Sequence, residues 1–182
     1  MIEKKPSFKP KQILWVDLEM TGLVPGPDVI LEVGAIVTDW NFTEIAEFEA
    51  VIHKDDTVLK NMNEWSVEQH GLSGLTDRVR EATATTEQVE DALLVFIDEH
   101  FDKDTPVLLA GNSIRVDRGF IAAEWPRLDA RLHYRMLDVT AWKVVFEGKY
   151  HKKFAKPEDH RALGDIRGSI QELEYYLKKV KA

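Results

Sequence analysis

The stretch Ile13–Met20, ILWVDLEM, places two carboxylates inside an otherwise apolar run of the kind that forms a buried β-strand. Asp17 and Glu19 are two residues apart, and side chains at that spacing point to the same face of a strand. Burying unpaired carboxylates is costly unless a cation compensates their charge. The pair therefore predicts a site for magnesium or manganese, which take oxygen ligands and leave coordination positions for water and phosphate.

The two acids are weak support on their own, since an edge strand with two solvent-facing carboxylates would carry the same residues. Their surroundings favour a metal site, because the run is apolar and a turn at Met20–Leu23 follows it directly. That turn is close enough to hold a substrate against bound metal ions.

Further strands and helices are predicted on the C-terminal side of this run. Strand-like segments at 29–38 and 44–53, separated by a polar turn, complete an antiparallel meander. We then expect short helices joined by glycine turns at 61–80, a helix at 86–101 capped by Thr86, and a buried strand at 107–110. A helix at 116–125 carries Asp117 in its first turn and ends at Pro126. The remaining elements are a helical segment at 137–146, a basic loop at 150–158 and a closing helix at 159–179.

Length and composition indicate one cytosolic domain. The chain has 182 residues, of which 44% are hydrophobic, enough for a single sizeable core. It has no cysteine, which excludes disulfides, thiolate zinc sites and a cysteine nucleophile. We expect no membrane span or signal peptide and a cytoplasmic location, because no run approaches the roughly 20 apolar residues that a span needs. Residues 1–12 are expected to form a mobile N-terminal arm and 13–182 the single domain.

The formal net charge of −8 argues against a protein that grips long nucleic acid through a broad basic face. It does not exclude nucleic acid as a substrate. Acidic residues that hold divalent cations make the metal-free chain acidic, whereas the metal-loaded site attracts phosphate.

Three motifs in order along the chain resemble those of the oligoribonuclease family, which belongs to the histidine subtype of the DEDD exonuclease superfamily. They are WVDLEMTGL at Trp15–Leu23, GNSIRVD at Gly111–Asp117 and HRALGD at His160–Asp165. The resemblance runs from about Ile13 to Tyr176. It implies a ribonuclease H-like α/β fold, with a central mixed sheet flanked by helices. It also implies hydrolysis of short single-stranded RNA oligonucleotides, especially dinucleotides, from the 3′ end to mononucleotides.

Matched motif by motif, the resemblance implies that two divalent cations, Mg²⁺ or Mn²⁺, are held by four carboxylates and that His160 is the general base. Such ions stabilise both the attacking and the leaving oxygen of an in-line displacement. A histidine suits proton removal from water, because its ordinary pKa of about 6.5 lies near working pH. The implied metal ligands are Asp17, Glu19, Asp117 and Asp165. Without its motif, His160 would be read as an exposed histidine at a helix start.

The resemblance also implies substrate contacts and a homodimer. Leu23 would wedge between bases and Trp65 would stack on one, although core packing is an equally good reading of a tryptophan. A second group would hold the phosphate at the far end of the substrate: Ser113, Tyr134, Arg135 and Thr140. Of these, Tyr134 and Arg135 would reach across the dimer interface. Arg135 has the clearest physical case, because a guanidinium offers a bidentate fork to phosphate. Among the other histidines, His70 and His133 are expected nearest the substrate.

The last motif departs from the family pattern, which has an acidic residue where this chain has Gly164. The neighbouring metal position, Asp165, is intact. Two other functions remain open: a related exonuclease acting on DNA or structured RNA ends, and a catalytically silent binding domain on the same fold. The His133–Arg135 stretch and the lack of a basic tract favour short RNA, while retention of all five reactive groups argues against a silent domain.

Overall fold

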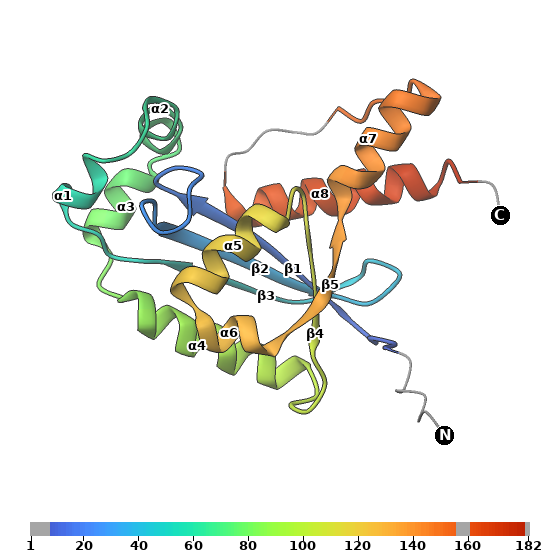
Figure 1. Cartoon of the computed structure of the whole chain (residues 1–182), viewed down its shortest axis with the longest axis horizontal. Coiled ribbons are helices and arrows are strands. Elements are labelled where there is room, and N and C mark those ends of the chain that lie inside the picture. The colour runs from blue at the N-terminus through green and yellow to red at the C-terminus, as the bar shows by residue number, and fades with distance from the viewer. Residues whose placement is uncertain (1–7, 156–160, 181–182) are drawn as a thin grey trace.

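The computed structural model describes residues 8–155 and 161–180. A mixed five-stranded sheet lies at its centre, in the order β3-β2-β1-β4-β5 (Figure 1). β1 pairs antiparallel with β2, and β2 with β3, so the predicted meander is confirmed. β4 and β5 run parallel to β1. The strands are β1 (Ile13–Met20), β2 (Ile30–Thr38), β3 (Glu44–Val51), β4 (Val107–Gly111) and β5 (Leu132–Asp138).

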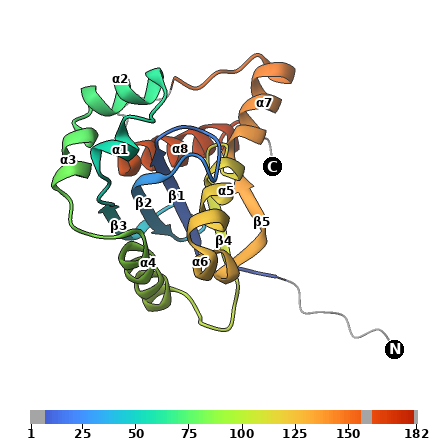
Figure 2. The same cartoon turned by 60° about the vertical axis from the view of Figure 1, so that its left-hand side comes forward.

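Helices cover both faces of this sheet, as the two views in Figures 1 and 2 show. Alternation along β1 divides its side chains between two cores, with Leu14 and Val16 on the face of α4, α5 and α6 and with Ile13 and Trp15 on the face of α8. The helices are α1 (Asp56–Leu59), α2 (Glu64–Leu72), α3 (Leu75–Glu81), α4 (Thr86–His100), α5 (Arg115–Glu124), α6 (Pro126–Arg131), α7 (Val139–Tyr150) and α8 (Ala162–Leu177). The predicted α/β architecture is thus confirmed.

One predicted helix cap and one predicted helix start are wrong, whereas α4 begins at Thr86 as predicted. Thr85, not Thr86, caps α4. The Thr85 hydroxyl accepts from the backbone N–H of Gln88, and the Gln88 side-chain oxygen accepts from the backbone N–H of Thr85. The closing helix begins at Ala162 rather than at 159, because Arg161 has an extended backbone. Its neighbours at 159 and 160 lie outside the described residues.

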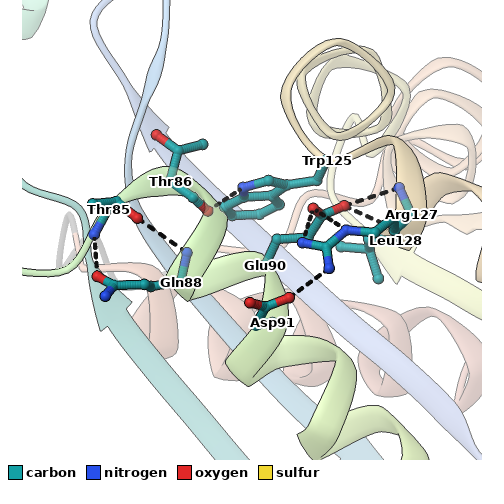
Figure 3. A network of polar contacts seen from close by, with 8 residues as sticks. All are labelled: Thr85, Thr86, Gln88, Glu90, Asp91, Trp125, Arg127 and Leu128. Atoms are coloured by element: carbon teal, nitrogen blue, oxygen red, sulfur yellow. Dashed lines mark hydrogen bonds and ion pairs between the residues drawn. The ribbon is translucent and has the colours of Figure 1, made fainter.

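A buried glutamate on α4 holds the start of α6, which the sequence did not predict (Figure 3). Glu90 Oε1 accepts from the backbone amides of Arg127 and Leu128, at 2.9 and 3.1 Å. Its Oε2 accepts from the Arg127 guanidinium at 2.6 Å. The first amides of a helix have no hydrogen-bond acceptors within the helix. The Glu90 carboxylate provides acceptors for two of them. Pro126 both ends the preceding helix and occupies the first turn of α6.

The last residues of the predicted N-terminal arm contact the edge strand β5 and the turn between β2 and β3. The Phe8 ring stacks on His133 with ring centroids 3.6 Å apart, and the Trp40 indole donates to the Pro10 carbonyl at 2.6 Å. The mobility of residues 1–12 stays a prediction. Within 8–155 and 161–180, every helix is too short or too polar to cross a membrane.

Candidate active site

Parallel pairing brings the C-terminal ends of β1, β4 and β5 to one edge of the sheet. Asp17 and Glu19 lie near the end of β1, on the face that α8 covers. β2 makes room for the helix there: a Cβ atom on Gly34 would lie 2.8 Å from the Cβ of Ala162. Gly34 is the register partner of Asp17, so the first turn of α8 comes down directly beside the β1 carboxylates.

Three of the four predicted metal ligands meet at this point. Asp17, Glu19 and Asp165 each offer a carboxylate oxygen, and these oxygens all lie within 4.8 Å of one another. Asp165 comes from the first turn of α8. Hard oxygen ligands at this spacing, each only partly exposed, are the donor set that a small divalent cation takes.

Asp117 is buried beside the same strand but does not belong to that three-carboxylate group. Its Oδ1 accepts from the Leu18 amide at 3.1 Å, between the two β1 acids. Burial raises the pKa of Asp117 to about 7, against the lowering effect of its backbone hydrogen bonds. Its role as a fourth ligand stays a prediction.

Glu19 is electrostatically poised for a cation. Burial, followed by the nearby charges of Asp165, Glu32 and Asp117, raises the pKa of its carboxyl to about 8, while Arg161 opposes them. At neutral pH the proton therefore competes for the position that a cation would take. A divalent ion would relieve both the burial penalty and the mutual repulsion, so these residues fit a metal centre.

His70 is buried against Glu19, closer to the carboxylates than the sequence indicated. Its Nε2 donates to the Met20 carbonyl at 2.9 Å, and because a carbonyl only accepts, the hydrogen of the neutral ring belongs to Nε2. Nδ1 then faces Glu19 Oε2 at 3.8 Å. Burial lowers the pKa of His70, which favours the neutral ring.

Two exposed apolar side chains lie in the segments next to the end of β1. Leu23 is 69% exposed and Trp65 58% exposed, so neither side chain packs in the core. The Asn63 amide donates to the Thr21 carbonyl at 3.3 Å, which joins the loop after β1 to α2. The sequence reasoning missed Asp28, whose carboxylate accepts from Val24 N and Thr21 Oγ1 and shapes the loop that carries Leu23.

Ser113 and Thr140, both predicted phosphate contacts, lie together at the ends of β4 and β5. Their hydroxyl oxygens are 3.0 Å apart, and Thr140 Oγ1 donates to Asn112 Oδ1 at 2.9 Å. Asn112 in turn donates to the buried Glu172 at 3.0 Å. The sequence reasoning missed Asn112 and Glu172; Asn112 stands inside the second motif, whereas nothing marked Glu172 among the polar residues of α8.

Tyr134 and Arg135 lie apart from this group within one chain. They lie in the first half of the edge strand β5, whereas Ser113 contacts Asp138 at its end. Tyr134 is 74% exposed, and the Arg135 guanidinium lies 5.4 Å from its ring centroid. His160, the predicted base, lies outside the described residues.

Comparisons with known proteins identify the family of this chain. The model of the exonuclease family matches residues 14–173. The probable oligoribonuclease of Schizosaccharomyces pombe is 42% identical over 94% of this chain and 69% of its own length. The Corynebacterium glutamicum oligoribonuclease is 45% identical over 91% of this chain and 78% of its own.

Solved structures share the fold at low sequence identity. Exonuclease I of E. coli, in complex with an oligonucleotide, matches with a TM-score of 0.70 and 16% identity over 94% of this chain. The match covers 41% of that exonuclease. The family model and the curated relatives show that the chain belongs to the exonuclease family and, within it, to the oligoribonucleases.

Proposed function

We propose that this chain is a 3′→5′ exoribonuclease that degrades short RNA oligonucleotides, dinucleotides above all, to mononucleotides in the cytoplasm. The observation that carries the proposal is the convergence of Asp17, Glu19 and Asp165 at one point. Exposed Leu23 and Trp65 support a nucleobase site, because stacking on apolar and aromatic surfaces suits single strands.

In this mechanism, the carboxylates of Asp17, Glu19 and Asp165, together with Asp117, would hold two divalent cations, Mg²⁺ or Mn²⁺. Bound there, such ions supply charge stabilisation for the attacking and leaving oxygens of the scissile phosphate. Leu23 and Trp65 orient the terminal bases so that the last phosphodiester reaches the carboxylates. His160 takes the proton from the attacking water.

The far end of the substrate is held by a second group of residues. Ser113 offers its hydroxyl hydrogen to the 5′ phosphate. Thr140 donates its single hydroxyl hydrogen to Asn112, so it would have to turn away from Asn112 to bind the phosphate as well. Tyr134 and Arg135, exposed on the edge strand, would complete this cap in the partner subunit of a homodimer. A cap at a fixed distance from the metals favours short chains.

An apolar hollow between α7 and the end of α8 supports an interface on that side of the molecule. It is lined by apolar and aromatic residues that include Trp142, Val145, Phe146, Tyr150 and Val180. Exposed apolar surface of this kind commonly marks a protein interface. We propose that the homodimer covers it.

The test is digestion of 5′-labelled RNAs of two, five and twenty nucleotides with magnesium, manganese or a chelator present, alongside DNA of the same lengths. We expect metal-dependent release of mononucleotides and the fastest turnover for the dinucleotide. The Asp165→Asn protein is the matched inactive control. Equal rates at all lengths, preference for DNA, or activity in excess chelator would overturn the proposal.

A further inference from the structure

Four charged side chains adjoin the carboxylates without being part of them. Arg78 Nη1 lies 2.6 Å from Glu32 Oε1, and Arg78 Nη2 lies 3.6 Å from Glu49 Oε1. Arg161 Nη2 contacts the same two carboxylates, at 3.7 Å from Glu32 Oε1 and 3.0 Å from Glu49 Oε1. This ion-pair cluster (Glu32, Glu49, Arg78, Arg161) therefore joins β2 and β3 to α3 and to the start of α8.

Glu32 makes the cluster more than a surface contact. Its side chain is fully buried, and it is the register partner of Glu19 on the neighbouring strand. A buried carboxylate is tolerated when cations and hydrogen bonds compensate it. Arg78 and Arg161 supply that compensation from two different helices, so the two arginines have similar charges and partners but anchor different elements.

Arg161 occupies the position that decides where the metal ligand of α8 lies. It is the N-cap residue of the helix, and its carbonyl accepts the Asp165 amide at 2.9 Å. Its own side chain makes no capping bond within the helix and instead reaches the two glutamates. The next residue, Ala162, is fully buried in the contact with Gly34.

We propose that Arg161 is a positioning residue: its ion pairs with Glu49 and Glu32 hold the first turn of α8 against β2 and β3, and so place Asp165 beside Asp17 and Glu19. The inference rests on the proposed function in taking Asp165 as a metal ligand. In the chain, Arg161 stands between the predicted base, His160, and the first turn of α8. A displacement of about 1 Å at a catalytic group can cost about a hundredfold in rate. Loss of the Arg161 ion pairs should therefore lower the rate strongly if it lets Asp165 move.

Two variants with the same charge change compare the two arginines, and hydrogen exchange separates positioning from the attraction that Arg161, unlike Arg78, exerts on Glu19. Arg161→Met and Arg78→Met each remove one guanidinium from the same two glutamates, but only the first releases α8. For Arg161→Met we expect about tenfold weaker Mn²⁺ binding by calorimetry and a kcat lower by about ten- to a hundredfold, with KM changed less than threefold. Arg78→Met should alter each quantity by less than about threefold, because α8 keeps its tether.

Hydrogen exchange tests the tether without reference to any substrate. The amides of Leu163–Asp165 should exchange faster in Arg161→Met and not in Arg78→Met, while exchange in the β1 core stays unchanged in both. Arg161→Lys should recover part of the loss, since a lysine restores one point charge but not the planar fork. If Arg161→Met does not fold, Glu49→Gln removes the shorter of the two contacts and should show the same losses in smaller measure.

The inference is overturned if both arginine variants lose Mn²⁺ affinity and kcat equally, or if exchange at Leu163–Asp165 is the same in both. Failure of the proposed function gives a different result. In that case the wild type would not hydrolyse short RNA, whereas the exchange difference between the two variants would persist. Arg167→Met is a same-helix control, because it breaks the ion pair with Glu44 beyond Asp165 and should leave Mn²⁺ affinity unchanged.

Discussion

Gly34 on β2 and Ala162 on α8 approach so closely that a Cβ atom on the glycine would lie 2.8 Å from the alanine Cβ and 3.0 Å from two backbone atoms of the helix. This contact sets the height of α8 above the sheet. Because Gly34 pairs with Asp17 in register, the same contact sets the separation between the β1 carboxylates and Asp165.

Replacing Gly34 by alanine should therefore move the first turn of α8 and damage the site from a distance. We expect a loss of about 1–3 kcal/mol in unfolding free energy, as for other overpacked contacts. Turnover should fall by at least about tenfold, since small displacements of catalytic groups are costly. Denaturant unfolding and dinucleotide hydrolysis measure the two effects. Adding Ala162→Gly should restore only part of the activity, because backbone atoms also lie within the clash; full rescue would contradict this account.

Local patterns in the sequence predicted the strands and helices whose periodicity is clear. The meander and the position of Asp117 in the first turn of α5 are confirmed. β5 was missed because its residues, Leu132–Asp138, form an edge strand with two exposed and four half-buried side chains and lack the apolar run of a buried strand. α6 was missed because Pro126 signals the end of one helix and the start of the next with the same residue.

The site was predicted through motifs, and the packing around it was not. A carboxylate pair two residues apart on a strand is visible in sequence, so Asp17 and Glu19 were found. The ion pairs of Arg161 join residues more than a hundred positions apart along the chain, and no local pattern reports such a contact. His70 likewise reaches Met20 across fifty residues, and only the fold shows that it is buried beside Glu19.

The raised pKa of Glu19 predicts how stability depends on pH. Its folded value of about 8 lies above its ordinary value of 4.5, so the folded protein binds this proton more tightly than the unfolded chain does. That contribution is fully present below pH 4.5 and is lost as pH rises through about 8. The metal-free melting temperature should therefore fall between pH 6 and pH 9, and less steeply in Glu19→Gln. Parallel curves for the two proteins would refute the assignment.

Added Mn²⁺ should stabilise the protein more at pH 8.5 than at pH 6, because the cation and the Glu19 proton compete for the same oxygens. The comparison is the rise in melting temperature at saturating Mn²⁺, measured at each pH. Asp165→Asn serves as the control, since it removes a ligand and should show a small rise at both values. An equal rise in the wild type at both pH values would mean that the ion binds elsewhere.

Amide substitution of any predicted metal ligand should nearly abolish hydrolysis while leaving the fold intact. In Asp17→Asn the shape is kept, but one charge and its affinity for a cation are lost. The metal-free variants should melt at a higher temperature than the wild type, because removing one acid relieves repulsion among crowded carboxylates. Circular dichroism and dinucleotide hydrolysis at saturating magnesium are the measurements. Full activity of Asp17→Asn would remove it from the metal centre.

His160→Ala should lower turnover by about 10² to 10⁴ while Mn²⁺ binding stays nearly unchanged, since general base catalysis contributes on that order. Loss of a base impairs proton removal from the attacking water and leaves Mn²⁺ affinity unchanged, whereas loss of a metal ligand lowers Mn²⁺ affinity. A metal titration therefore distinguishes the two roles. Calorimetry of the wild type and the variant provides that comparison. A collapse of Mn²⁺ affinity in His160→Ala would make the histidine a ligand instead.

Mixing two damaged chains tests whether the 5′ cap crosses a dimer interface. Asp17→Asn loses the metal site, and Arg135→Ala loses a charged hydrogen bond to phosphate, which is worth roughly ten- to a hundredfold in affinity. If Arg135 acts in the partner's site, each heterodimer contains one site with both defects and one with neither. Random exchange of equal amounts then restores about a quarter of all sites, because half of the dimers are heterodimers. If Arg135 acts within its own chain, no site is repaired. Dinucleotide hydrolysis after subunit exchange decides between the two placements of Arg135, and native mass spectrometry verifies that the exchange took place. A mixture no more active than the sum of its separate components would place the cap within one chain.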